Sequence, residues 1–284
     1  MRYDCIIIGS GPAGLSAAMN LKTYNKNFLW FGNANLSEKV QKAEKVTNYP
    51  GLCEVTGQEL AAAFLKHKES QGLEITDKIV SSIYDMGGYY TVMAENQFFE
   101  TESIILAMGV VAANQYQGEA EFVGRGVSYC ATCDGALYKG KTIAVVATAK
   151  RFEHEIAFLA DLAEKVYLFP YYKDCEIEKE NVEFVKKPIK EIKGGFRADE
   201  LIIGDGESMK VDGIFIMRSA IAPTTLLSKL AVEDGHIGVN RQMETNLKGI
   251  FAAGDCTGKP YQYAKAVGEG NVAAHSVIEY LGEK

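Results

Sequence analysis

A glycine-rich turn near the N-terminus constrains the fold of this chain more than any other feature. The stretch YDCIIIGSGPAGLSAAMNLKTY reads as an apolar strand, a turn that matches GxGxxG, and a helix with apolar periodicity over residues 13–21. Gly9 permits the tight turn, Gly11 lets the backbone approach a pyrophosphate, and Gly14 lets the helix pack closely on the strand. Because a helix N-terminus offers free N–H groups and a positive dipole end, the pattern predicts a dinucleotide-binding unit.

The same strand, turn, helix and strand pattern begins again in the stretch KTIAVVATAKRFEHEIAFLADLAEKVYLF, residues 141–169. Between the two patterns we expect a helix with a capping box at Thr56 and Glu59, short strands in YYTVMAEN, QFFETES and SIILAMG, and a connector over 109–126. The stretch 249–281 predicts a strand, a loop and a long closing helix opened by AVGEG, residues 266–270. The chain therefore has two similar α/β halves, each beginning with a nucleotide-binding pattern.

Composition and charge exclude several function classes. With 284 residues, 47% of them hydrophobic and 24% charged, the chain is long enough and apolar enough for two folded domains. The formal net charge of -7 disfavours nucleic-acid binding, which needs a basic surface. No apolar run approaches the roughly 18 residues of a membrane span, and the N-terminus lacks the features of a signal peptide. A cytoplasmic protein that does not associate with membranes is expected.

Two of the six cysteines, Cys130 and Cys133, form a CxxC pair in CATCDG, while the other four are scattered. A structural zinc site normally needs a second ligand pair, and the four histidines lie far apart in sequence, so no metal site is predicted. A redox dithiol is favoured over a zinc site or an inert thiol pair. Asp134 follows the pair directly and is suited either to handle the proton of a thiol or simply to cap a helix.

Further motifs resemble those of FAD-dependent disulfide reductases. They are LAMG (106–109), AAGDC (252–256) and AVGEG, found together with GSGPAG. The resemblance implies that Asp255 holds the flavin ribityl chain, that the last helix directs its N-terminus at the flavin, and that LAMG packs the chain against the cofactor. The acidic residue that usually binds a ribose after the second strand is absent, because the sequence there is Phe31-Gly32-Asn33.

Taken with NYPG (48–51), the stretch GRGVSYCATCDG is similar to that of the bacterial-type, low-molecular-weight thioredoxin reductases, and the resemblance runs nearly end to end. It implies two three-layer (ββα) Rossmann-like nucleotide-binding domains: an FAD domain over 1–112 and 241–284, and an inserted domain of the NADPH type over 113–240. It also implies that Cys133 faces the flavin, that Cys130 exchanges with thioredoxin, and that the protein is a homodimer. The residues expected to contact FAD are Gly9, Ser10, Gly11, Pro12, Ala13, Gly14, Gly32, Asn33, Asn48, Ile79, Ala107, Met108, Gly109, Cys133, Gly254, Asp255, Gln262, Tyr263 and Ala264.

The second turn departs from the pattern of this family. Where family members have GxGxxA for NADPH, this chain has Ala147, Ala149 and Phe152, whose side chains obstruct the approach of a pyrophosphate. The arginine cluster that follows the next strand in the family is replaced by PYYKDCE, in which Lys173 is the single cation and Glu176 repels phosphate. The chain thus differs from the family at both ends of the expected NADPH site, which argues against NADPH binding.

A branch of the family with these properties is known, and this chain resembles it: the ferredoxin-dependent flavin thioredoxin reductases, which keep FAD and CxxC and lack the NADPH motifs. The resemblance implies electron transfer from ferredoxin, or flavodoxin, through FAD and the Cys130–Cys133 pair to thioredoxin. Lys39, Lys42 and Lys45 would share one face of a helix, near Lys22 and Lys26 in sequence, and could form a docking patch for an acidic ferredoxin or simply a solvated face.

Three alternatives stay open at this point. The inserted domain could bind a second flavin or another donor, with Phe152, Tyr171 and Tyr172 stacking on a ring. NADPH could still bind through unusual contacts. The protein could also be a non-catalytic FAD-binding sensor or scaffold, although the intact CATCD motif disfavours that reading.

Overall fold

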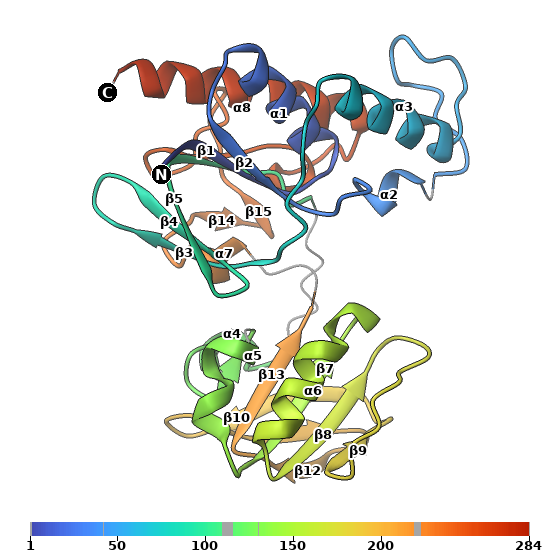
Figure 1. The fold of residues 1–284 in the computed structure, drawn as a ribbon, viewed down its shortest axis with the longest axis vertical. Helices are drawn as coiled ribbons and strands as arrows, with labels where there is room; N and C mark the ends of the chain where they lie inside the picture. Colours follow the sequence, from blue (N-terminus) through green and yellow to red (C-terminus); the bar gives the residue numbers. More distant parts are fainter. Residues whose placement is uncertain (1, 42, 110–115, 130, 219–222, 284) are drawn as a thin grey trace. The chain divides into compact units, whose positions relative to one another are not determined.

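The computed structural model describes residues 2–41, 43–109, 116–129, 131–218 and 223–283. The chain forms two compact units, the first made of Met1–Ala112 and Ala222–Lys284 and the second of Ala113–Ile221 (Figure 1). The second unit is thus inserted into the first. The chain returns to the first unit at residue 222, earlier than the expected boundary at 241, because helix α7 (Pro223–Leu226) packs against strand β3 (Val80–Asp85) of that unit.

The first unit begins with the predicted strand, turn and helix. Its elements are β1 (Tyr3–Ile8), α1 (Pro12–Thr23), β2 (Phe28–Phe31), α2 (Glu38–Gln41), α3 (Gly57–Ser70), β3, β4 (Tyr90–Ala94), β5 (Gln97–Leu106), α7, β14 (Val232–Glu233), β15 (His236–Ile237), β16 (Ile250–Ala252), the 3₁₀ turn η3 (Asp255–Thr257) and α8 (Tyr263–Gly282). The predicted capping box of α3 is present, since the Thr56 hydroxyl accepts from the Glu59 amide and the Glu59 carboxylate accepts from the Thr56 amide.

Strand β5 joins the two parts of the first sheet. Its second half pairs in parallel with β1 and β16, and its first half pairs antiparallel with β4, which in turn pairs with β3. The prediction of two separate strands in QFFETES and SIILAMG was therefore wrong, because one continuous strand serves both the parallel sheet and the antiparallel extension.

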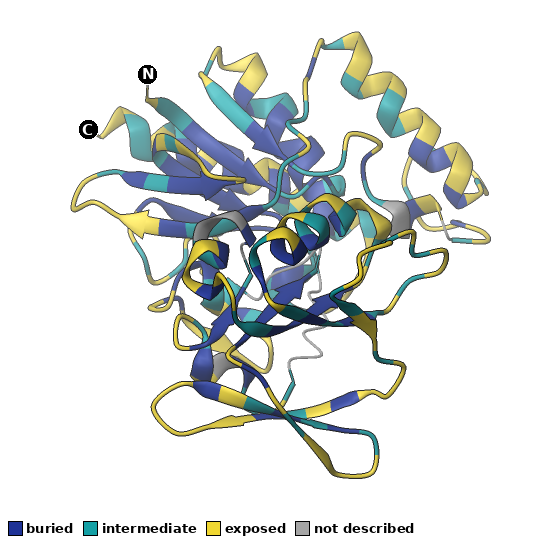
Figure 2. Cartoon of the chain, turned by 60° about the horizontal axis from the view of Figure 1, so that its bottom comes forward, coloured by how far each residue is buried: buried dark blue, intermediate teal, exposed yellow. Residues whose placement is uncertain are grey.

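Helices α1 and α8 cover one face of the parallel strands (Figure 1). Apolar side chains of both helices, such as Leu21 and Val277, form one buried cluster with Ile7 of β1 and Ile105 of β5. In Figure 2 the strands are mostly buried, whereas the helices that cover them have exposed residues on their outer sides. Helix α8 begins at Tyr263, one turn before the predicted AVGEG start, so Gly270 lies inside the helix.

The second unit repeats this layering. Its elements are α4 (Glu119–Phe122), β6 (Val127–Ser128), α5 (Ala131–Asp134), the 3₁₀ turn η1 (Gly135–Tyr138), β7 (Thr142–Ala147), the 3₁₀ turn η2 (Lys150–Phe152), α6 (Glu153–Leu162), β8 (Lys165–Pro170), β9 (Val182–Phe184), β10 (Ile189–Gly194), β11 (Ala198–Ile203), β12 (Glu207–Lys210) and β13 (Gly213–Met217). The parallel sheet has the order β6-β13-β7-β8-β9, and β10-β11-β12 form a separate antiparallel sheet.

One apolar cluster joins these two sheets, since Val146 of β7 and Ile216 of β13 pack with Ile192 of β10 and Leu201 of β11. Together with α6, which follows β7 in the strand–helix–strand unit, the two sheets give the expected ββα arrangement. The α/β fold class predicted from the sequence is confirmed. Among the described residues, no helix combines the length and the apolarity that crossing a bilayer would require.

Candidate active site

Three sequence motifs meet at one edge of the first sheet. The register places Ile8, Leu106 and Ala252 side by side, so the turns that follow β1, β5 and β16 are neighbours. A Cβ on Gly9 would lie 2.1 Å from the carbonyl oxygen of Ala107, and Gly9 has a φ of +117°. The glycine turn and LAMG are therefore in direct backbone contact, which only glycine at position 9 permits.

The last motif joins this contact through its own glycines. A Cβ on Gly254 would lie 2.9 Å from the Cβ of Ala13, and a Cβ on Gly270 would lie 2.1 Å from the carbonyl oxygen of the same alanine. Helix α8 and the turn that contains Gly254 and Asp255 are thus in close contact with the start of α1. The structure brings GSGPAG, LAMG and AAGD together as the sequence predicts.

The N-terminus of α1 is open toward a ligand. A Cβ on Gly11 would meet no heavy atom within 4 Å, although the neighbouring glycines of the motif are tightly enclosed. Gly11 is the N-cap residue, no side chain caps the helix, and the first turn carries no acidic residue. Free N–H groups and the positive end of a 12-residue helix are therefore available to an anion at this turn.

Contacts around Ser10 and Trp30 fix the shape of this turn. The Ser10 hydroxyl accepts a hydrogen bond of 2.9 Å from the amide of Asn33, and a Cβ on Gly32 would lie 2.6 Å from Ser10. The indole of Trp30 donates to the carbonyl of Gly9 at 2.9 Å. These contacts place the end of β2 beside the first turn, where an expected ribose contact would lie, although no carboxylate is supplied.

Two further predicted residues, distant in sequence, are also neighbours. The amide of Asn48 donates to the side-chain oxygen of Gln262 at 2.7 Å, and both side chains are otherwise exposed. Tyr263 packs against the cluster that contains Val40 and Leu60, and burial raises the pKa of its hydroxyl. Among the remaining predicted residues, Ile79 and Met108 are half-buried, Gly109 has a φ of +69°, and Ala264 is exposed in the first turn of α8.

Sequence reasoning missed the pair Lys265 and Glu269, which holds the GD loop. The Lys265 ammonium donates to the carbonyls of Gly254 and Gly258 and to the Thr257 hydroxyl at 2.8 to 2.9 Å, and it pairs with Glu269 at 3.0 Å. The Glu269 carboxylate accepts from the Gly254 amide at 2.8 Å. Only the i, i+4 spacing signals this pair in the sequence, and such spacing is common on solvated helix faces.

The second turn is built differently from the first. Ala149 is extended, with φ -155° and ψ 150°, and no residue from 147 to 152 has positive φ. Ala147 is fully buried and the Phe152 side chain is 3% exposed. Of the three side chains that replace the family's small residues, those of Ala147 and Phe152 are therefore part of the core, and that of Ala149 is half-buried.

The chain's own carboxylates occupy the N-terminus of α6. Glu153 and Glu155 lie in its first turn, and a Glu153 oxygen accepts from the Tyr172 hydroxyl at 3.0 Å and from the Glu176 amide at 3.1 Å. Desolvation opposes the shift, but these hydrogen bonds lower the pKa of Glu153 below its usual value. Lys150 pairs with Glu176 at 2.6 Å. The positions that the family resemblance assigns to NADPH thus make contacts within the chain.

The aromatic side chains considered for a second flavin differ in exposure, since Phe152 is buried, Tyr172 is half-buried and Tyr171 is 47% exposed. Phe152 is buried, the Tyr172 hydroxyl is bound to Glu153 and lies 3.0 Å from the Cys175 sulfur, and Tyr171 accepts a hydrogen bond from the Ile189 amide. Ordinary packing accounts for the first two of these residues.

Of the predicted dithiol, Cys130 lies outside the described residues, and for Cys133 the structure describes the backbone alone, within α5. Asp134 is half-buried and makes no side-chain capping bond to the 3₁₀ turn that follows it. Leu137, seven residues after Cys130, leaves 68% of its surface exposed.

Two other cysteines are unsuited to redox chemistry. Burial raises the pKa of the Cys5 thiol to about 12 and that of the Cys256 thiol to about 11. Both stay protonated near neutral pH, and the thiolate is the reactive species. Among the described residues, no group of three His, Cys, Asp or Glu side chains is arranged to hold a metal ion.

The expected lysine patch is not a single helical face. Helix α2 spans Glu38–Gln41 and includes Lys39, whereas Lys45 lies beyond it and pairs with Glu54 at 2.9 Å. Lys42 lies outside the described residues, and for Lys39 the side chain is not described. The premise of one shared helix face was therefore wrong.

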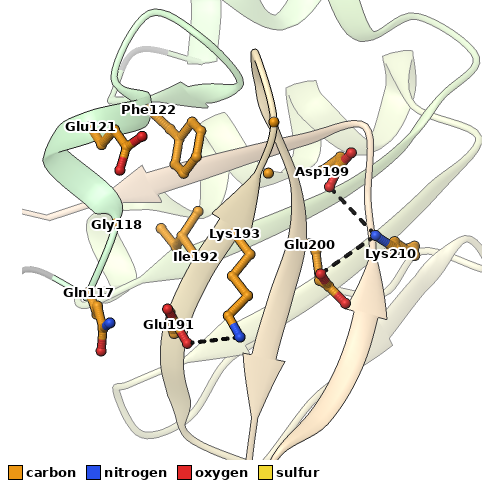
Figure 3. Close-up of a pocket in the computed structure, with 12 residues that line it drawn as sticks. Gln117, Gly118, Glu121, Phe122, Glu191, Ile192, Lys193, Asp199, Glu200 and Lys210 are labelled. Atoms are coloured by element: carbon orange, nitrogen blue, oxygen red, sulfur yellow. Dashed lines mark ion pairs between the residues drawn. The ribbon is translucent and has the colours of Figure 1, made fainter.

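A pocket of about 530 Å³ lies elsewhere, between α4 and the β10-β11-β12 sheet (Figure 3). Its cations are neutralised within the pocket: Lys193 pairs with Glu191 at 3.3 Å, and Lys210 pairs with Asp199 and Glu200 at 3.6 and 3.5 Å. None of the predicted site residues lines it. The candidate site is therefore placed at the glycine turn of the first unit and not in this pocket.

Comparison with known proteins identifies the family of this chain. The family model described as "Pyridine nucleotide-disulphide oxidoreductase" matches residues 3–150 and 171–270. The chain belongs to the pyridine nucleotide-disulphide oxidoreductase family. The unmatched stretch between the two segments contains α6 and β8, the helix and strand that follow the altered second turn.

Individual members of this family are similar over the whole chain. The thioredoxin reductase of Bacillus subtilis is 32% identical over 305 residues, covering 99% of this chain and 95% of that protein. A crystal structure of a ferredoxin-flavin thioredoxin reductase from Clostridium acetobutylicum is 46% identical with a TM-score of 0.91, covering 100% and 99% of the two chains. A second structure of the same description gives 43% and 0.88, covering 100% and 98%.

The family consists of FAD-binding flavoproteins, and the residues of the first unit fit FAD. The space beside Gly11, the uncapped α1 N-terminus and the absence of acidic residues in its first turn suit a pyrophosphate. The chain thus has the flavoprotein fold of the thioredoxin reductases.

Proposed function

We propose that this protein is a ferredoxin-dependent thioredoxin reductase that does not use NADPH. Its electrons come from reduced ferredoxin, or flavodoxin, and leave through the Cys130–Cys133 dithiol to thioredoxin. The proposal agrees with the description of the Clostridium acetobutylicum protein, whose name joins ferredoxin, flavin and thioredoxin reductase.

The contrast between the two helix N-termini carries the proposal. The α1 terminus has no acid in its first turn and open space at Gly11, whereas the α6 terminus holds Glu153, which is bound to Tyr172 and Glu176. One turn is therefore prepared for a phosphate and the other repels one. A reductase that keeps the first site and has lost the second needs an electron donor other than NADPH, and the name of the Clostridium acetobutylicum protein includes ferredoxin.

In the first unit, the site residues hold and orient FAD. Gly9, Gly11 and the α1 terminus receive the pyrophosphate, and Asp255, held on its loop by Lys265 and Glu269, binds the ribityl chain. FAD bound there would supply the conversion between one-electron and two-electron transfer that disulfide reduction requires. Two donations from a one-electron carrier are therefore required for each disulfide reduced.

In the second unit, the dithiol performs thiol-disulfide exchange. The Cys130 thiolate attacks the thioredoxin disulfide to give a mixed disulfide, and Cys133 then displaces the reduced thioredoxin, leaving the Cys130–Cys133 disulfide. Asp134 takes up or returns the thiol proton, and the exposed Leu137 forms part of the docking surface. We also propose a homodimer in the cytoplasm, where a reducing environment keeps thioredoxin in use.

NADPH is expected to show no saturable binding to the purified flavoprotein in calorimetric titration up to about 1 mM, the upper end of ordinary cofactor affinities. The physical reason is that Glu153 and the Lys150–Glu176 pair occupy the positions that its phosphates would need. An NADPH-dependent thioredoxin reductase titrated in the same buffer serves as the positive control. Saturable micromolar binding by this protein would contradict the proposal.

A further inference from the structure

A fully buried carboxylate in the second unit has no part in the site described so far. The Glu119 side chain has no exposed surface, and both of its oxygens are bound. One oxygen accepts from the Tyr129 hydroxyl at 2.7 Å, and the other accepts from the Tyr116 amide and from the Arg218 guanidinium, each at 2.9 Å. Such a network is expensive to bury and is stable only with all its partners present.

These partners come from three separate places in the chain. Tyr116 is the first described residue after the chain enters the second unit, and Arg218 is the last described residue before it leaves. Tyr129 directly precedes Cys130, the outer cysteine of the proposed dithiol. One buried ion pair thus joins the beginning and the end of the second unit to the residue that leads into the CxxC pair.

Packing makes the network stiff. The Arg218 guanidinium, with 15% of its side chain exposed, lies over the Tyr116 ring at 5.5 Å from the ring centre. Burial raises the pKa of Tyr116, so its hydroxyl stays neutral. A Cβ on Gly118 would lie 2.1 Å from the Ile192 carbonyl oxygen, so the turn before Glu119 is pressed against strand β10. The carboxylate therefore sits on a fixed backbone, and Tyr129 is held by a fixed acceptor.

We propose that Glu119 is a positioning residue for the dithiol. Its carboxylate, oriented by Arg218, holds Tyr129 and thereby restricts the chain at the residue that precedes Cys130. This inference rests on the proposed function, because it assumes that the two cysteines form the working disulfide. The restriction raises the effective concentration of one thiol at the other and so stabilises their disulfide against reduction.

The test is the equilibrium between the dithiol and glutathione, which needs neither ferredoxin nor thioredoxin. In it, the two protein thiols give two electrons and two protons to one glutathione disulfide, forming one protein disulfide and two molecules of glutathione. The holoprotein is equilibrated in glutathione buffers, acid-quenched, alkylated and cleaved with trypsin. Cleavage after Arg125 and Lys139 releases a peptide that contains Cys130 and Cys133 and no other cysteine.

Tyr129→Phe removes one hydroxyl-to-carboxylate hydrogen bond and leaves the ion pair in place. Tyr172→Phe is the matched control, because it also removes a tyrosine-to-glutamate bond in the same unit, to Glu153 at 3.0 Å. We expect Tyr129→Phe to lower the equilibrium constant for disulfide formation about tenfold, a shift of ~30 mV toward easier reduction, and Tyr172→Phe to match the wild type. Glu119→Gln should act in the same direction if it folds.

Equal equilibrium constants for Tyr129→Phe, Tyr172→Phe and the wild type would overturn the positioning role and leave the proposed function standing. If the wild-type peptide never loses two hydrogen masses on oxidation, no Cys130–Cys133 disulfide forms. That result would overturn the proposed function and this inference together.

Discussion

Replacing Cys130 or Cys133 with serine is expected to lower thioredoxin reduction to background, a loss of roughly 1000-fold or more, while the FAD content stays unchanged. A serine oxygen cannot form or exchange a disulfide, and two of the other cysteines are too buried to substitute. Cys5 and Cys256 are buried with raised pKa values. The measurement is ferredoxin-driven thioredoxin reduction, with the flavin absorbance of each purified variant as the test of a folded first unit.

Cys53→Ser is the control for this experiment, because Cys53 is exposed and lies in the first unit away from the CxxC pair in sequence. It should keep wild-type turnover. Substantial activity in both serine variants of the pair would show that the electrons reach thioredoxin by another route. Binding of a partner by the inactive variants without any redox activity in the wild type would instead favour the scaffold interpretation.

Adding a side chain at Gly11 is expected to remove FAD binding without disturbing the fold. The residue has φ -76° and ψ -176°, which other residues adopt, and a Cβ there meets no protein atom within 4 Å. The added group would instead occupy the path of the pyrophosphate, and losing two hydrogen bonds to a charged group weakens affinity by roughly 100-fold or more. Gly11→Val should weaken binding more than Gly11→Ala, as measured by flavin fluorescence on reconstitution of the apoprotein.

Gly88→Ala is the matched control, since a Cβ at Gly88 also meets open space but lies in the β3–β4 turn. It should bind FAD as the wild type does, and the apoprotein melting temperatures of all three variants should agree. Gly9→Ala is the opposite case, because its Cβ would overlap the Ala107 carbonyl and disturb the fold itself. Normal FAD affinity in Gly11→Val would mean that the pyrophosphate does not lie at this turn.

Local chemistry made part of the fold predictable. Short stretches of sequence were enough to predict the close backbone contact at Gly9 with its positive φ. They were also enough to predict the reciprocal hydrogen bonds of Thr56 and Glu59, and the structure contains both features. The start of α8 was missed because Gln262 caps the helix with no side-chain bond and the glycines of AVGEG imitate a turn. Strand β5 was divided because nothing in its sequence shows that one strand pairs in both the parallel and the antiparallel part of its sheet.

The site shows the same division. The turns after β1, β5 and β16 could be brought together from their motifs, because parallel strands end at a common edge. The role of the Lys265–Glu269 pair could not be predicted. The same i, i+4 spacing occurs in pairs on solvated helix faces and in pairs that bind a neighbouring loop. The sequence showed that the second turn lacks the glycines of the family. It could not show that Tyr172 and Glu176 bind Glu153, because these hydrogen bonds join residues that are 19 and 23 positions apart.

The most direct test of the account is anaerobic reduction of the bound flavin, followed as loss of absorbance at about 450 nm, where flavins absorb. NADPH is added first, then reduced ferredoxin, and oxidised thioredoxin last. The account predicts no bleaching with NADPH, full bleaching with ferredoxin, and recovery of the absorbance as thioredoxin is reduced. Rapid bleaching by NADPH alone would contradict it and would show that the filled second turn still admits the nucleotide.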